Sequence, residues 1–113
     1  MTAGDFRRIA LALPETQEGA HHGHADFRVG GKVFATLGYP DGAWGVVMLP
    51  PDEQEVRSHA MPEVFVPVPG AWGRTGSTQV RLEAADESTL TGVLAAAWRT
   101  RAPTRLAAQA SNL

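Results

Sequence analysis

The sequence has no cysteine, a single lysine and a single tyrosine among its 113 residues. Without cysteine, disulfide bonds, zinc–thiolate sites and thiol catalysis are excluded. No apolar run approaches the roughly 18 residues that a membrane-spanning helix needs. Acids and arginines interrupt the first twenty residues, so we expect no signal peptide. These absences favour a cytoplasmic protein.

An excess of charge of either sign is also missing. The chain has 10 basic and 12 acidic residues, a formal net charge of −2. Nothing global therefore attracts nucleic acid or an anionic membrane, and binding to either would need a local basic patch. A hydrophobic content of 43% at this length predicts one folded domain over residues 1–113 with a single core.

Two segments have the apolar spacing of amphipathic helices. The first follows a capping box that begins at Thr2, has apolar residues at i, i+3, i+4 and i+7, and stops at Pro14. The second follows Asp86, shows the same spacing and ends before Pro103. A third helix is expected over residues 51–60, where three acids suit the positive end of the helix dipole.

Between the helices, turn-forming residues separate short segments of strand character. Gly30-Gly31 joins residues 25–29 to residues 32–37, which predicts a two-residue hairpin. Direct pairing would place Phe27 opposite Phe34, Arg28 opposite Val33, and Asp26 opposite Ala35. Further strands are expected over residues 18–22, 43–49, 64–66 and 78–82, and an extra helical turn over residues 104–113.

The resulting order is helix, three or four strands, helix, two strands, helix. Antiparallel strands that follow one another in the chain need helices on only one face to bury their apolar side chains. The sequence therefore predicts an α+β fold, a two-layer sandwich in which helices cover one face of an antiparallel sheet.

A glycine-rich segment at residues 69–78 runs directly into the predicted strand at 78–82. It holds Trp72 and Arg74, so a large aromatic side chain and a cation lie on a connection beside the sheet. Such a segment can bind a ligand, or it can be a lid that packs on its own core, and the sequence leaves both open.

Five short segments together resemble one known family. They are Asp26–Val29 with Gly31–Ala35, then Pro62–Val64, Gly70–Gly73 and Thr78–Leu82. In these, the chain resembles the MmcQ/YjbR family from its first helix to about residue 103. The resemblance implies a two-layer fold with an antiparallel sheet, similar to secretion chaperones. Members are often labelled DNA-binding through a double-wing comparison, so the resemblance also implies DNA as a partner.

The nucleic-acid hypothesis has named residues. Arg28 and Lys32 belong to the first hairpin, and Arg74 and Arg81 follow Trp72. If the two regions lie side by side, the four cations form a stripe flanked by Trp44 or Trp72, suited to phosphates and stacked bases. The alternative is that these arginines are scattered and paired with acids, and that Trp72 and Trp98 are core residues.

A second hypothesis is a chaperone-like protein-interaction module or a small-ligand-binding module. Its surface would be formed by Phe65, Trp72 and Trp44, from an apolar edge strand and the glycine-rich segment. Two observations discriminate the hypotheses. Four cations on one exposed face would favour nucleic acid, whereas an exposed Trp72 over an open cavity would favour a ligand.

Enzymatic chemistry has little support in the sequence. His22, His24 and Asp26 would share one face of a strand, with His21 pointing away, and could reach one metal ion. No HExxH motif, nucleophile elbow or phosphate loop is present, so an exposed polar turn is favoured there. We therefore expect a non-enzymatic domain with no cofactor and leave its oligomeric state open.

Overall fold

The computed structural model describes residues 1–110 of the chain, and the last part of the helical turn expected over 104–113 lies outside the described residues. Four short strands follow the first helix, and two more strands are separated by short helices before the C-terminal helices. In chain order the elements are α1 (Ala3–Leu11), β1 (Gln17–His21), β2 (His24–Val29), β3 (Lys32–Leu37), β4 (Trp44–Met48), α2 (Pro51–Ala60), β5 (Phe65–Pro67), α3 (Ala71–Arg74), β6 (Ser77–Arg81), a 3₁₀ turn (Leu82–Ala84), α4 (Glu87–Arg101) and α5 (Thr104–Gln109).

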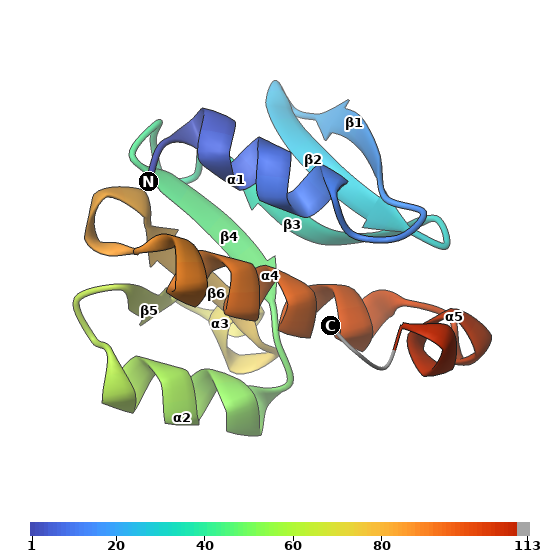
Figure 1. Ribbon diagram of the computed structural model, residues 1–113. Helices are drawn as coiled ribbons and strands as arrows, with labels where there is room; N and C mark the ends of the chain where they lie inside the picture. Colours follow the sequence, from blue (N-terminus) through green and yellow to red (C-terminus); the bar gives the residue numbers. More distant parts are fainter. Residues whose placement is uncertain (111–113) are drawn as a thin grey trace.

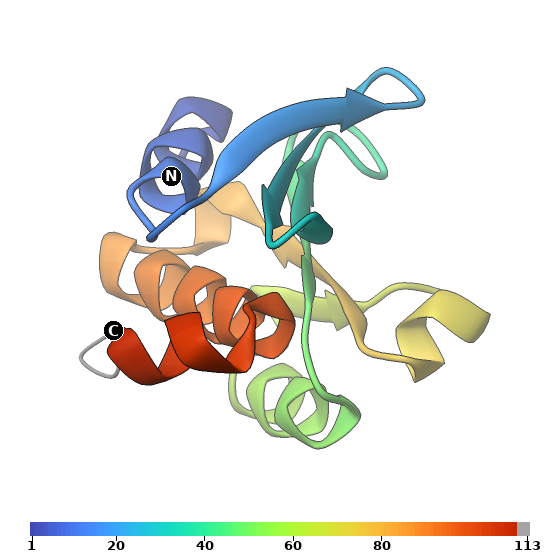
Figure 2. The ribbon, with the colours of Figure 1, turned by 90° about the vertical axis from the view of Figure 1, so that its right-hand side faces the viewer.

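The strands form one antiparallel sheet in the order β1-β2-β3-β4-β6-β5. Helix α4 packs on β3 and β4, and α1 packs on α4 (Figure 1). The view in Figure 2 shows α1, α4 and α5 on one side of the sheet and α3 on the other. The predicted α+β sandwich is confirmed. The short helix α3, on the face opposite α4, was not predicted.

The core lies between the sheet and helices α1 and α4. Trp98 of α4 is fully buried, and its indole N–H donates a 2.9 Å hydrogen bond to the carbonyl of Pro14. Gly45 of β4 leaves room for the ring of Phe6, since a Cβ there would come within 2.5 Å of that ring. The apolar spacing of both helices thus corresponds to a real buried face, as their periodicity predicted.

The register of the first hairpin differs from direct pairing. Arg28 lies opposite Val33 as expected, but an irregularity between Phe27 and Arg28 shifts the remaining pairs by one residue. Phe27 therefore lies opposite Ala35, and the predicted pairing with Phe34 is wrong. An extra residue of this kind bends the strand and cannot be read from the turn alone.

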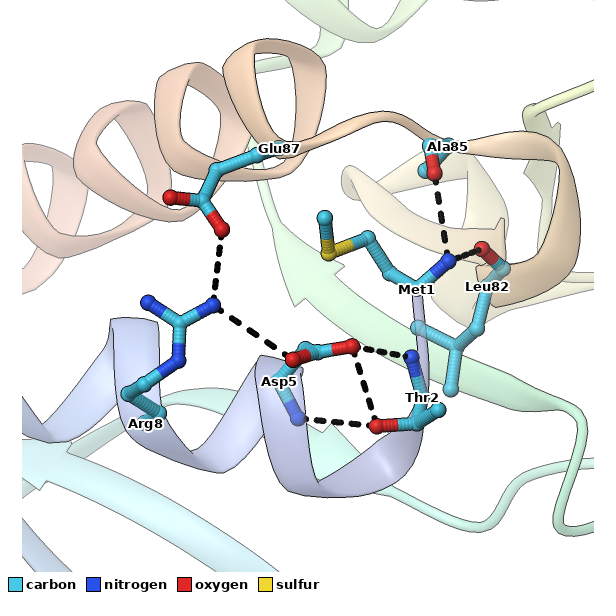
Figure 3. Close-up of polar contacts among 7 residues, drawn as sticks. All are labelled: Met1, Thr2, Asp5, Arg8, Leu82, Ala85 and Glu87. Carbon is cyan, nitrogen blue, oxygen red and sulfur yellow. Dashed lines mark hydrogen bonds and ion pairs between the residues drawn. The ribbon is translucent and has the colours of Figure 1, made fainter.

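Polar contacts fix the start of α1 against the turn before α4 (Figure 3). Thr2 and Asp5 form the predicted capping box, each accepting from the other's backbone N–H. Arg8 bridges Asp5 and Glu87, at 3.4 and 2.7 Å. The amino group of Met1 donates to two backbone carbonyls in that turn. These contacts hold α1 on the helical layer and leave the opposite face of the sheet to other segments.

Candidate functional site

The face of the sheet opposite α1 and α4, here called the open face, carries a row of cross-strand neighbours. Asp26 lies opposite Thr36, Thr36 opposite Val46, and Val46 opposite Gln79. A cavity of about 470 Å³ lies on this face, bounded by the β1–β2 turn, the β3–β4 loop and α3. Its lining consists of His21, His22, His24, Thr36, Tyr39, Val46, Met48, Val68, Trp72, Thr75, Ser77 and Arg101.

Trp72 of α3 lines this cavity and is 70% exposed. Its support is built closely against the sheet, because a Cβ on Gly73 would lie 1.7 Å from the carbonyl oxygen of Val68. A Cβ on Gly76, where φ is 113°, would lie 1.8 Å from the carbonyl oxygen of Leu49. Both glycines are therefore required, because any side chain there would prevent the backbone from approaching the segments at Val68 and Leu49 so closely.

A buried amide holds the same segment from the other side. The Nε2 atom of Gln54, in α2, donates to the carbonyls of Gly73 and Ser77 at 2.9 and 3.1 Å, and to Thr78 Oγ1 at 3.1 Å. Gln54 itself is buried. An exposed tryptophan is thus carried by a tightly fixed segment, which differs from a loose surface loop.

At the opposite side of the cavity, His21 contacts a buried carboxylate. Asp26 is fully buried and accepts from Arg28 Nε at 2.8 Å and Arg28 Nη2 at 3.0 Å, while His21 Nδ1 lies 2.6 Å from its Oδ2. The hydrogen bond from Arg28 outweighs burial and, with that from His21, lowers the pKa of Asp26 to about 2. The carboxylate is therefore ionised at neutral pH and fixes one nitrogen of the His21 ring.

The remaining lining combines apolar side chains with hydroxyl groups, which carry no charge. Val46, Met48 and Val68 supply aliphatic and thioether surface. Ser77 Oγ donates to Met48 Sδ, and Thr75 Oγ1 donates to the carbonyl of Trp72, so both hydroxyls have internal partners. No carboxylate belongs to the part of the lining that the structure describes. An apolar site with a few polar groups at its margin is typical of small-molecule binding.

A second hollow, of about 570 Å³, lies near the β2–β3 turn. It is lined by polar side chains and glycine backbone, including Glu15, Thr16 and Arg28. The guanidinium of Arg28 is already bound by Asp26, and no aromatic side chain lines this hollow within the described residues. It is less suited to a small molecule than the cavity on the open face.

The four predicted nucleic-acid residues occupy different parts of the fold. Arg28 is paired with Asp26, and the guanidinium of Arg81 lies 4.3 Å from the ring centroid of Trp44. Lys32 begins β3, whereas Arg81 ends β6 next to the other end of β3, so these two lie at opposite ends of the sheet. Arg74 ends α3. The arrangement is not the compact stripe that the sequence suggested.

The predicted ligand surface is corrected at Phe65, one of its three residues. Phe65 is 2% exposed, because β5 places it opposite Val80 in the core between the sheet and the helices. Trp44 is half-buried against Arg81 and is not one of the cavity-lining residues. Trp72 does line the cavity. The sequence noted the histidines only as possible metal ligands and did not connect them to Trp72.

The histidine cluster does not have the arrangement expected of a metal site. His21, expected to point away, is the one that contacts Asp26, because the turn at residues 22–23 reverses the chain and sets His21 opposite His24. Within residues 1–110, no group of three or more His, Asp or Glu side chains could hold a metal ion. In the same residues, no helix has the length and apolar character to cross a membrane.

The fold and the site define the class of this protein: a small two-layer α+β domain with a cavity on the uncovered face of its sheet. Residues 11–100 match the family model described as YjbR, and the chain belongs to this family. It is similar to a crystal structure of Deinococcus radiodurans protein DR2400, with a DUF419 domain, at a TM-score of 0.74 and 18% identity over 88% of this chain and 77% of that one. This likeness concerns the fold alone. No curated protein matches the chain.

Proposed function

We propose that this domain is a non-enzymatic binding module that takes up a small, largely apolar molecule in the cavity on the open face. The observation that carries the proposal is Trp72, which is 70% exposed and lines a cavity of about 470 Å³ while its backbone is held tightly. Cavities of about 300–1,000 Å³ with aromatic walls and a few polar groups are the usual size and composition for small ligands.

The test is a screen of small aromatic compounds against the full chain, followed by tryptophan fluorescence and two-dimensional amide NMR. Binding in the cavity should quench Trp72 and shift amide signals of the lining residues together. Trp98 is fully buried and should respond much less. Amide shifts confined to other surfaces, or no binding in a screen of this kind, would contradict the proposal.

A matched pair of variants makes the screen specific. Trp72→Ala should weaken binding, since an aromatic wall contributes stacking and apolar contact. Val56→Ala is the control, because Val56 is 68% exposed on α2 and is not among the cavity-lining residues. Equal binding by both variants would remove Trp72 from the site.

DNA binding is the second candidate, and one observation favours it. Among the described residues, Lys32 and Arg74 have no acidic partner, and Arg81 faces an aromatic ring, so three cations remain available for phosphates. Fluorescence anisotropy with duplex DNA at low and physiological salt tests it. Phosphate contacts predict affinity that falls steeply with salt and weakens in Arg74→Ala/Arg81→Ala. Absence of binding at low salt would end this candidate.

A further inference from the structure

We propose that the ligand of this cavity is a planar aromatic carboxylate, with its ring against Trp72 and its anionic group at Nε2 of His21. The inference rests on the proposed ligand-binding function and names its chemical class. It follows from three properties of the cavity: the charge of its lining, the orientation of His21 and the apolar surface between His21 and Trp72.

The charge of the lining favours an anion. Three histidines and Arg101 line the cavity, and none of its described lining residues is acidic. The nearby Asp26 is fully buried and has both oxygens occupied by Arg28 and His21. A cationic ligand would therefore find no free carboxylate, whereas an anion would meet groups that are positive or able to become so.

The orientation of His21 is fixed by the same carboxylate. Because Nδ1 lies 2.6 Å from Asp26 Oδ2, only Nε2 of this ring is left for a partner, and the side chain is 43% exposed. A carboxylate that holds one imidazole nitrogen sets the ring's orientation for the other. When the ring carries both protons, Nε2–H is a donor for an anion. With one proton, on Nδ1, Nε2 is an acceptor and repels a carboxylate.

A carboxylate at Nε2 therefore requires the form of the His21 ring that carries both protons. The titratable and charged groups of the site, in the cavity lining and in the Asp26 ion pair, come from several elements. They are Asp26, Arg28 and His24 of β2, His22 of the turn, Tyr39 of the β3–β4 loop and Arg101 of α4. A neutral ligand of the same shape makes no such demand.

The apolar part of the site selects the shape of the ligand. Val46, Met48 and Val68 form surface for an uncharged ring, and the exposed indole of Trp72 offers a flat face. Aromatic rings stack on such faces with an offset or at an edge. A bicyclic aromatic acid fits this combination, because it has one flat apolar body and one anionic end.

The experiment compares 2-naphthoate with 2-naphthamide on the full chain, by tryptophan fluorescence and amide NMR at pH 6. We expect the carboxylate to bind about tenfold more tightly than the amide at pH 6, since charge-assisted hydrogen bonds are roughly twice as strong as neutral ones.

The variant His21→Asn sharpens the comparison. Asparagine keeps a donor for Asp26 but removes Nε2, so the preference for the carboxylate should disappear while amide binding remains. His59→Asn is the control, because His59 is an exposed residue of α2 outside the lining. A preference that persists in His21→Asn would overturn the role of His21.

The possible failures are distinguishable. Equal affinity for 2-naphthoate and 2-naphthamide would overturn the carboxylate inference and leave the proposed ligand-binding function standing. Failure of both compounds to shift the lining residues, together with an empty fragment screen, would overturn both. Tighter binding of the amide would also contradict the inference, because it would show that the site prefers a hydrogen-bond donor.

Discussion

On the helix-covered face of the sheet, side chains such as Leu37, Val80 and Phe65 are buried in an apolar core beneath α1 and α4. On the open face, Asp26, Thr36 and Gln79 are also almost fully buried, but they are polar, and Thr36 lines a cavity with an exposed tryptophan. The two faces thus share one backbone and differ in chemistry. One face supplies stability by apolar burial, and the other keeps polar groups and open volume that stability alone does not require.

The largest expected change in the free energy of unfolding comes from a substitution in the core of the helix-covered face. Trp98→Ala removes the largest fully buried side chain and its hydrogen bond to Pro14, so unfolding free energy should fall by about 4 kcal/mol. Urea unfolding followed by circular dichroism measures it. A loss below about 1 kcal/mol would mean that the helix-covered face does not carry the stability assigned to it.

The next largest loss of unfolding free energy should come from disturbing the close backbone packing next to α3. Gly76→Ala introduces a Cβ 1.8 Å from the carbonyl oxygen of Leu49 at a φ of 113°, so we expect a loss of about 3 kcal/mol. Gly92→Ala is the matched control, because a Cβ at that position of α4 meets nothing within 4 Å. The control should gain about 0.5–1 kcal/mol from helix propensity. Equal effects of the two substitutions in urea unfolding would contradict the tight support of Trp72.

The buried carboxylate of the open face predicts a dependence of stability on acid. Its pKa is lowered from 3.8 to about 2 by Arg28 and His21, so the ionised form stabilises the folded chain by about 2 kcal/mol at neutral pH. This stability is present above pH 4 and is lost as the pH falls toward 2. Asp26→Asn should remove that part of the acid dependence. Parallel urea unfolding of the two proteins between pH 2 and 7 isolates it, and identical slopes would contradict the assignment.

The smallest expected change in stability is at the cavity itself. Trp72→Ala should alter the free energy of unfolding by less than about 0.5 kcal/mol, since the indole is 70% exposed. The same substitution should weaken binding of an aromatic ligand about tenfold, which corresponds to about 1.4 kcal/mol. Combined unfolding and binding measurements check both numbers. A large stability loss here would mean that Trp72 packs on the protein instead of serving a ligand.

Much of the helix-covered face could be predicted from the sequence. The capping box at Thr2, the helix that ends at Pro14 and the helix that follows Asp86 are local patterns, and each is confirmed. Strands joined by Gly30-Gly31 are confirmed as well, with boundaries shifted by one residue at most. These features depend on residues close together in the chain, where spacing and turn chemistry act directly.

The open face could be predicted only in fragments. The sequence drew attention to the histidines at 21, 22 and 24 and to Trp72, but gave no reason to place them around one cavity. The irregular register after Phe27 and the buried position of Phe65 were not predictable from alternation either. Strand order and register join segments that are far apart in the chain, and a shift of one residue changes which side chains share a face.

The sequence by itself determined most of the helices and strands and the α+β fold, because these follow from short-range periodicity, capping and turn residues. It also carried the resemblance to the family that the family model shows. Only the tertiary structure decided that Asp26 holds His21, that Gln54 and two glycines hold Trp72 exposed, and that both lie beside one cavity. The physical reason is that a binding site depends on contacts between distant segments. Such contacts are set by the packing of the whole sheet, and no local pattern encodes them.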